Sequence, residues 1–544
     1  MTSAYPNGDS ARDSQDVSQP KQSLFPDAIA IPPEVLARHR ALVLDPATAA
    51  RTKRGNRPIS TVYRADSMLI PLREVQSLVP RPGQVSRSEI NNELAKIGLQ
   101  LRPRPEQEVI DGAPPELGVS VPLVRLEDAP ADRAPDPWTA LVALRDAFGD
   151  RVKHFGLDHL VLSASVAVEG APVSHGGMVG GTPVSHGGSV GGGTVALHTG
   201  SRNPVALLMP QPPRPAKVPA GRRPVVAVLD TGIGPHPWWS KHRPGDPIIE
   251  VSQEFQDLLA AQEGQQQNPT ELGPLNHPED VPNEIQPLLG LIDSHAGHGT
   301  FVAGLVHQMC PAAKILSLRV LHTDGFSTEG SLLLALHWLA KRVESGDPDE
   351  MVDIVSLSLG FYPETTDPEK VLQVKAAIER LTSLGVLVVA AAGNDATTRP
   401  FMPAAFGHGT GSAASGVELL SGVGARNAPG HTTAAFSNWG EWISRWAPGD
   451  ALVSTVPVWD GAALGGIRYP DGGGLGPWMR SAPDPDDLRS GFAVWAGTSF
   501  ATPVVSGLLA QALAEDTTAK TDMVGRAKRA LIATDAELAR RYWQ

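Results

Sequence analysis

Short, almost continuous runs of apolar residues mark the C-terminal two-thirds of the chain. They are PVVAVLD at 224–230, AKILSLRVL at 313–321, VDIVSLSLG at 352–360 and GVLVVAAAGN at 385–394. Such runs are typical of strands that are buried on both faces. Helical periodicity separates them, at 299–309, 330–345 and 367–385. This alternation predicts an α/β fold, a doubly wound and mostly parallel sheet with helices on both faces.

The first third of the chain predicts a smaller α+β domain, over residues 24–165. The pattern predicts a helix after the Pro32-Pro33 pair and a second helix that is opened by a cap at Ser86 or Ser88. A third helix has Pro137 in its first turn. In order, the expected elements are helix 33–49, strand 60–72, helix 86–101, strand 119–127, helix 136–152 and strand 156–168.

The flanking segments are polar or rich in small residues. Residues 1–23 predict a disordered tail, and residues 166–222 predict a Gly/Pro-rich linker to an α/β domain at 223–535. The linker contains two near-copies of PVSHGG, in which His175 and His186 recur. A metal site at these histidines is one interpretation, but the glycine-rich composition favours a flexible linker.

Charge and cysteine content exclude several classes of protein. The 544 residues carry 46 basic and 58 acidic side chains, a net charge of −12, without a Lys/Arg block of the kind that binds nucleic acid. Cys310 is the single cysteine, so no disulfide forms within the chain, and we expect it to be a small buried apolar residue. Neither a signal peptide nor a run of about 18 apolar residues is evident, so we expect no membrane partner and a cytoplasmic protein.

Asp230 ends the first apolar run of the α/β domain. The carboxyl edge of a parallel sheet is where functional sites lie, so a carboxylate there is a candidate catalytic group. An Asp that caps a turn would suit the same position. Gly232 and Gly234 follow it without a third glycine at the right spacing, so the dinucleotide-binding fingerprint is incomplete.

His298 stands between two glycines at the start of a predicted helix. Its context, GHGTFVAG at 297–304, distinguishes it from the other 15 histidines, most of which must be structural or exposed. His295 is the local competitor, but it lacks flanking glycines. A histidine held at a helix start can present its ring to an open site as a general base.

Ser499 and Asn394 complete the set of candidate residues. Ser499 lies in GTSFATP at 497–503, a tight turn into an apolar helix, where unpaired N–H groups favour developing negative charge. Asn394 ends the run GVLVVAAAGN, where its amide could donate to an oxyanion. An ordinary helix cap and an ordinary turn asparagine are the structural alternatives.

Together these residues supply a carboxylate, a base, an oxyanion donor and a nucleophile, in the chain order Asp, His, Asn, Ser. Over residues 222–515 the sequence resembles the subtilisin-like (subtilase) family, through DTGI at 230–233, HGTFVAG at 298–304, AAGN at 391–394 and GTSFATP at 497–503. The resemblance implies a serine endopeptidase with the triad Asp230, His298 and Ser499 and with Asn394 in its oxyanion hole. It implies no cofactor for the chemistry, and no stretch matches the family's structural calcium sites.

The resemblance also implies how a protein or peptide substrate binds. The family's substrate pairs as an extra strand between two enzyme segments. The matching segments are the stretch from Val320-Leu321 to about Ser327 and the run Ser356, Leu357, Ser358, Leu359 and Gly360. Phe301 and Phe500 replace the second histidine and the methionine that many members have.

Family members usually carry an α+β prodomain, which implies this role for residues 24–165. We expect self-cleavage between about residues 166 and 222, with the mature enzyme beginning close to Arg223; a permanent accessory domain is the alternative. Two other functions stay open: a dedicated intracellular processing protease for one precursor, and a catalytically silent binding protein on the same fold.

Overall fold

The computed structural model describes two stretches of the chain. It describes residues 31–164 and 202–542, apart from breaks at 52, 54–56, 77–82, 106–109, 111, 130–133, 241–244, 264–274, 276–278, 280–283, 287–290, 408–416, 429, 460–468, 471–478, 481–487 and 519–521. The predicted tail at 1–23 and the histidines of the repeat, His175 and His186, lie outside these residues.

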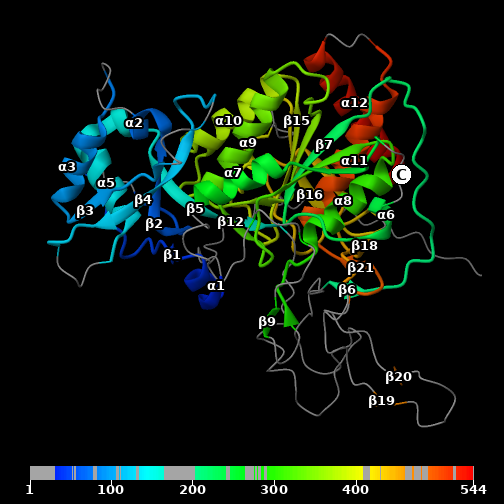
Figure 1. Ribbon diagram of the computed structural model, residues 1–544, viewed down its shortest axis with the longest axis horizontal. Helices are drawn as coiled ribbons and strands as arrows, with labels where there is room; N and C mark the ends of the chain where they lie inside the picture. The colour runs from blue at the N-terminus through cyan, green and yellow to red at the C-terminus, as the bar shows by residue number, and fades with distance from the viewer. Residues whose placement is uncertain are drawn as a thin grey trace, which may run out of the picture.

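Seven parallel strands form the central sheet (Figure 1), in the order β17-β16-β15-β13-β7-β11-β8. The four apolar runs of the sequence form β7, β11, β13 and β15, so the predicted parallel sheet is confirmed. The strand bounds are β7 Val225–Asp230, β8 Ile249–Val251, β11 Lys314–Arg319, β13 Ile354–Leu357, β15 Leu387–Ala391, β16 Leu420–Arg426 and β17 Arg445–Pro448.

Helices cover both faces of this sheet, because side chains from one strand enter two different cores. Ala227 and Leu229 of β7 pack with one set of helices, α7, α9 and α10, and Val226 and Val228 pack with the other set, α8, α11 and α12. Cys310, at the end of α8, is buried as predicted. The helix bounds are α6 Pro237–Ser240, α7 Gln253–Glu263, α8 His298–Met309, α9 Glu329–Glu344, η3 Pro368–Lys370, α10 Leu372–Ser383, η4 Ala404–Phe406, α11 Thr498–Glu515 and α12 Met523–Tyr542.

The N-terminal region is an antiparallel sheet with helices, as the α+β pattern predicts. Ser86, one of the two expected caps, forms a capping box with Glu89, but the expected helix 86–101 is wrong at its end, where residues 99–101 form β3 and pair with β4. The expected helix 33–49 is wrong beyond its first turns: Arg40 has a left-handed backbone (φ 49°), and the chain then pairs with β2. The bounds are α1 Pro33–Arg38, β1 Ala41–Val43, β2 Val62–Pro71, α2 Leu72–Gln76, α3 Arg87–Ala95, β3 Leu99–Leu101, β4 Gly118–Arg125, α5 Pro137–Phe148, η1 Gly149–Val152 and β5 Gly156–Ser163.

The two parts of the chain share a sheet. Its order is β12-β5-β2-β4-β3, in which β12 (Phe326–Thr328) comes from the α/β part, and β14 (Leu359–Gly360) also pairs with β5. Figure 1 shows β5 at the junction between the blue N-terminal region and the green strands. Apolar residues of β2 and β4 belong to the same buried cluster as those of α9 and α10, so the junction is part of the hydrophobic core.

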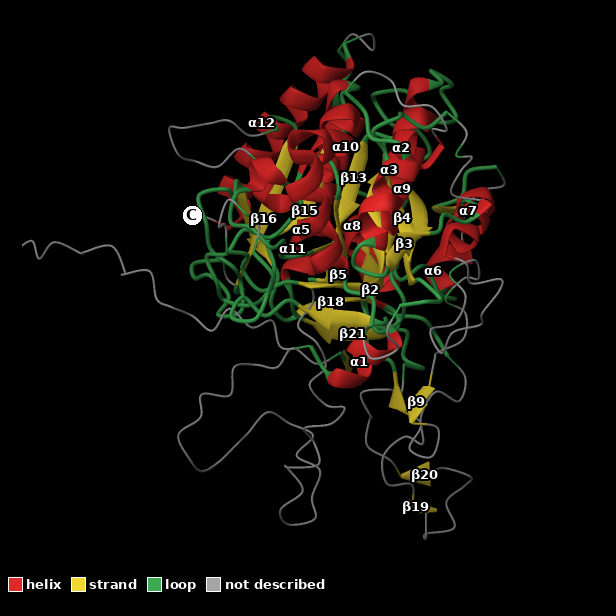
Figure 2. Cartoon of the chain, turned by 90° about the vertical axis from the view of Figure 1, so that its left-hand side faces the viewer, coloured by secondary structure: helices red, strands yellow, loops and turns green. Residues whose placement is uncertain are grey.

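A small sheet, β18-β21-β6, lies beside the central one (Figure 2) and includes chain from the expected linker. β6 pairs with β21, and Ala220 N donates to Ala514 O (2.9 Å), so residues 202–222 pack against the α/β part where they are described. No helix within the described residues is long and apolar enough to cross a membrane. The remaining strands are β6 Asn203–Pro204, β9 Glu284–Gln286, β10 Leu291–Ile292, β18 Leu452–Thr455, β19 Tyr469–Pro470, β20 Met479–Arg480 and β21 Phe492–Trp495.

Candidate active site

The four candidate residues meet at the carboxyl edge of the central sheet. Asp230 is the last residue of β7, and Asn394 follows β15. His298 is the first residue of α8, and Ser499 is the second residue of α11. Parallel strands end at one edge of a sheet, so residues up to 269 positions apart can share one site.

Asp230 orients the ring of His298. Its Oδ1 atom lies 2.7 Å from His298 Nδ1 and also accepts the N–H of Thr231 (2.8 Å). Both side chains are almost completely buried. A carboxylate at Nδ1 selects the tautomer in which Nε2 is free to take a proton. One carboxylate oxygen of Asp230 thus contacts both the backbone of the next residue and the His298 ring.

Aromatic rings hold the other side of His298. The His298 ring centroid lies 5.1 Å from that of Phe500 and 5.4 Å from that of Trp495, and Phe301 packs on both rings. Phe301 and Phe500 are fully buried. The two phenylalanines that depart from the family pattern therefore pack on each other, and Phe500 supports the imidazole through apolar contact.

The hydrogen bonds of Ser499 and His298 point to different partners. Ser499 Oγ donates to the carbonyl of Ser358 (2.9 Å), and His298 Nε2 lies 3.2 Å from Ser163 Oγ. Among the described residues, no hydrogen bond joins Ser499 Oγ to His298. Ser163 thus occupies the nitrogen that a serine nucleophile needs for its activation.

A carbonyl of the N-terminal region lies between two donors. Ala164 O accepts the backbone N–H of Ser499 (2.8 Å) and a hydrogen bond from Asn394 Nδ2. Asn394 is held in place because its Oδ1 accepts both the N–H and the hydroxyl of Thr498 (2.9 Å each). Two convergent donors on one carbonyl oxygen have the arrangement of an oxyanion hole.

The strand that carries Ala164 lies between β12 and β14. β5 is antiparallel to both, with Leu162 opposite Phe326 and opposite Gly360. At the end of β5, Ser163 N donates to Gly325 O (2.7 Å), and in the next residue Ala164 N donates to Ser358 O (2.9 Å).

The predicted substrate-binding residues divide into two groups. Ser358, Leu359 and Gly360 contact the bound strand. Ser356 and Leu357 belong to β13, where they pair with β7 and β15 inside the central sheet. The structure therefore brings only the last three of these five residues to the site.

Three residues at the site escaped the sequence analysis: Ser163, Ala164 and Glu279. Glu279 accepts the N–H of Gly297 (2.7 Å) and the hydroxyl of Thr231 (3.0 Å), so it braces the segments on either side of the Asp230–His298 pair. Burial raises the pKa of Glu279 to about 8, against the nearby charge of Arg319. Glu279 lies in the long interval before His298, where no periodic pattern marks it.

The electrostatics of the site disfavour a second histidine as the base. His295 lies beside His298, with ring centroids 5.9 Å apart. Burial, and then the neighbouring His298, lower its pKa to about 3, so His295 stays neutral. Within the ranges that the structure describes, no group of three or more His, Cys, Asp or Glu side chains is placed to hold a metal ion.

Comparisons with known proteins identify the family of the chain. The sequence profile of the Subtilase family matches residues 221–542, more than half of the chain. A thermophilic serine proteinase of Bacillus sp. (strain AK1) is 28% identical over 233 residues, which are 43% of this chain and 43% of that protein. The serine protease AprX of Bacillus subtilis (strain 168) is 24% identical over 298 residues, 54% and 58% of the two chains.

Solved structures align as well. A cold adapted subtilisin-like serine proteinase matches with a TM-score of 0.34 and 19% identity over 59% of this chain and 85% of its own. The chain spans about two-fifths to three-fifths of the length of the curated relatives above.

Proposed function

Because the chain belongs to the subtilase family, we propose that it is a serine endopeptidase whose catalytic triad is Asp230, His298 and Ser499. The observation that carries the proposal is the carbonyl of Ala164, which accepts hydrogen bonds from Ser499 N and Asn394 Nδ2. In this position the carbonyl accepts the backbone N–H of Ser499, the residue whose hydroxyl would attack it.

Each residue has a defined role in the proposed reaction. Ser499 Oγ attacks the scissile carbonyl while His298 Nε2 takes its proton, and the proton then passes to the leaving amine. Asp230 keeps His298 in the required tautomer through the 2.7 Å contact at Nδ1. Asn394 and the Ser499 N–H stabilise the negative charge that develops on the carbonyl oxygen. Water then hydrolyses the acyl-enzyme ester on Ser499.

We further propose that the N-terminal region acts as a prodomain that is bound in the cleft as the first substrate. Its last described residues are Ser163, which ends β5, and Ala164, which follows it, and β5 pairs with β12 and β14 as an extended substrate would. The proposed cut is the bond between Ala164 and Ser165, at the edge of the expected linker and far from Arg223. Arg223 itself forms an ion pair with Asp246 (2.8 Å).

Charged contacts also hold the proposed prodomain against the segment that leads into β12. Arg38 forms ion pairs with Asp293 (3.3 Å) and Asp324 (3.1 Å), and His39 Nε2 lies 2.8 Å from Asp324. Asp324 and Gly325 immediately precede β12. Arg38 and His39 of the N-terminal region therefore bind the segment that leads into the substrate-binding strand.

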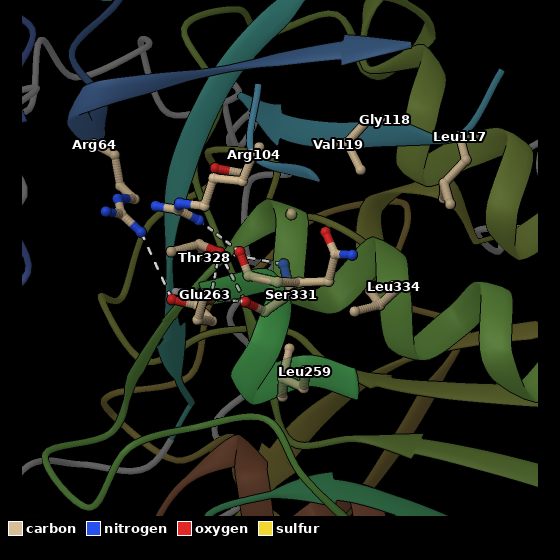
Figure 3. A pocket seen from close by; sticks show the side chains of 13 residues that line it. Arg64, Arg104, Leu117, Gly118, Val119, Leu259, Glu263, Thr328, Ser331 and Leu334 are labelled. Atoms are coloured by element: carbon tan, nitrogen blue, oxygen red, sulfur yellow. Dashed lines mark hydrogen bonds and ion pairs between the residues drawn. The ribbon is translucent and has the colours of Figure 1, made fainter. Parts of the chain in front are cut away.

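A second charged contact lies deeper in the junction (Figure 3). Arg64 of β2 reaches Glu263 at the end of α7 (3.6 Å), and Glu263 accepts hydrogen bonds from Thr328 and Ser331. Thr328 caps α9 and ends β12. The Glu263 carboxylate thereby contacts both the N-terminal region, through Arg64, and the substrate-binding strand, through Thr328.

Mass spectrometry of the purified protein beside its Ser499→Ala variant tests the proposal. We expect wild type to be cut after Ala164 and the variant to stay intact. A fluorophosphonate probe should label Ser499 once residues up to 164 have dissociated. If active enzyme keeps residues 31–164 covalently attached, the N-terminal region is a permanent accessory domain and not a prodomain. No labelling and no cleavage of any peptide would favour the catalytically silent binding protein.

A digest of a mixed peptide library separates the two remaining forms of the proposal. Cleavage of many sequences indicates a general endopeptidase, whereas cleavage of very few indicates a processing protease for one precursor.

A further inference from the structure

We propose that Phe401 closes the pocket that receives the substrate side chain next to the scissile carbonyl, so that the enzyme cleaves after Ala, Gly or Ser and rejects large residues. The inference rests on the proposed peptidase function and adds the substrate class. The pocket is defined by the residues that pack with Ala164: Tyr362, Ala391 and Phe401.

Ala164 lies where the substrate residue before the scissile bond would bind. Its carbonyl lies between Ser499 N and Asn394 Nδ2, and its N–H donates to Ser358 O. The position of the scissile carbonyl is therefore known. The residue is only 2% exposed, and it is part of a buried apolar cluster with Tyr362, Ala391 and Phe401. The methyl group of Ala164 therefore already fills the pocket.

The ring of Phe401 lies between the two segments that flank Ala164. A methyl group on Gly360, in β14, would come within 2.8 Å of Phe401 Cδ1, and one on Gly393, just before Asn394, would come within 3.2 Å of Phe401 Cγ. Gly360 and Gly393 bound the space on either side of the substrate residue. Phe401 therefore occupies the volume into which a longer substrate side chain would extend.

The ring cannot easily move aside, because a second ring backs it. The centroids of Phe401 and Tyr362 are 4.9 Å apart, and Phe401 is fully buried. The Tyr362 hydroxyl donates to Asp395 (2.5 Å) and accepts from Asn438 (2.7 Å). The guanidinium of Arg399 lies 4.9 Å from the centroid of the Tyr362 ring. Buried side chains that are packed on several sides resist displacement.

The expected discrimination is large. One extra methylene against a pocket wall changes the specificity ratio by about 10- to 200-fold. A benzyl group adds several atoms where Phe401 already stands. We therefore expect kcat/KM for a substrate with Ala before the cut to exceed that for Phe by at least about 100-fold.

Two peptides that differ at one residue test this preference. Both copy residues 160–165, Leu-Val-Leu-Ser-Ala-Ser and Leu-Val-Leu-Ser-Phe-Ser, with polar extensions for solubility. Wild type should cleave the first peptide at least about 100-fold better. Phe401→Ala should lower this ratio at least tenfold by raising kcat/KM for the Phe peptide. Phe401→Leu, which disturbs packing less, should shift the ratio in the same direction.

A matched control separates the pocket from general loosening. Phe255 is equally buried but packs against Trp338, in a different apolar cluster from Ala164 and Phe401, and Phe255→Ala should keep the wild-type ratio. Wild type that cleaves both peptides equally, or Phe401 variants that are folded and active with an unchanged ratio, would overturn the proposal.

The chain itself provides a second readout. Ala164→Phe should slow self-cleavage after residue 164, and the added Phe401→Ala substitution should restore it. Absence of rescue, while wild type is still cut after Ala164 and then labelled at Ser499 by fluorophosphonate, counts against the pocket and leaves the peptidase function standing. Absence of labelling in wild type after removal of residues 31–164 counts against the peptidase function itself.

Discussion

Replacement of Asn394 by Leu tests the oxyanion hole directly. Ala164 O accepts from Ser499 N, from Asn394 Nδ2 and, at 3.4 Å, from Thr498 Oγ1, and the substitution removes the amide donor of Asn394. Loss of one such donor typically lowers turnover by about 10²- to 10³-fold, or about 2.7–4 kcal/mol of transition-state stabilisation. We expect the rate constant of self-cleavage after Ala164 to fall by this factor.

The same substitution has a separate effect on stability. Asn394 Oδ1 accepts the N–H and the hydroxyl of Thr498, and Leu leaves both without this acceptor. An unsatisfied buried polar group costs about 1–3 kcal/mol, so the melting temperature should fall as well. Asn394→Asp keeps the acceptor oxygen but removes the donor. It should restore much of the stability and none of the rate.

The assay follows both quantities in the same protein. First-order self-cleavage is measured by mass spectrometry over time, and unfolding is measured by calorimetry on variants that also carry Ser499→Ala. A self-cleavage rate for Asn394→Leu within a few-fold of wild type, in folded protein, would remove Asn394 from the site. Recovery of the rate in Asn394→Asp would show that the acceptor role, rather than the donor role, limits turnover.

Two further predictions rest on the described contacts. Ser163→Ala removes the group that lies 3.2 Å from His298 Nε2, and since a hydrogen bond contributes about 0.5–1.5 kcal/mol, self-cleavage should accelerate by roughly 2- to 10-fold; an unchanged or slower rate in a time course would contradict this. Burial lowers the pKa of His159, but its hydrogen bonds with Glu329 and Glu364 outweigh this effect and raise the pKa to about 10 from 6.5. The cleaved N-terminal segment should therefore bind with full affinity below about pH 6.5 and dissociate progressively as the pH rises toward 10; gel filtration of the cleaved protein checks this, and His159→Gln should flatten the response.

Local patterns were sufficient to predict the frame of the site. The apolar runs that end at Asp230 and Asn394 predicted buried parallel strands, and the apolar runs that follow His298 and Ser499 predicted helix starts. Strand ends and helix starts of a parallel sheet meet at one edge, so the sequence order sufficed to bring the four residues together. The same local logic predicted the capping box at Ser86 and the burial of Cys310.

Pairing between distant segments was decided only by the tertiary structure. The sequence of β5 indicates a strand, but it carries no information on its partners, which lie 164 to 198 positions away in β12 and β14. Ser163 and Ala164 therefore had no signal that placed them against His298 and Asn394. The expected helix 33–49 failed for a related reason, since pairing with β2 prevailed over helix propensity after Arg40.

Phe401 and Glu279 illustrate the same limit at the level of single side chains. Phe401 lies in a loop, and only the packing of that loop between Gly360 and Gly393 turns its ring into the floor of the substrate pocket. Glu279 lies in an interval without periodicity, and only the fold brings its carboxylate to Thr231 and Gly297. Periodicity in a sequence records which face of an element is buried; which distant side chain covers that face depends on how the elements pack in three dimensions.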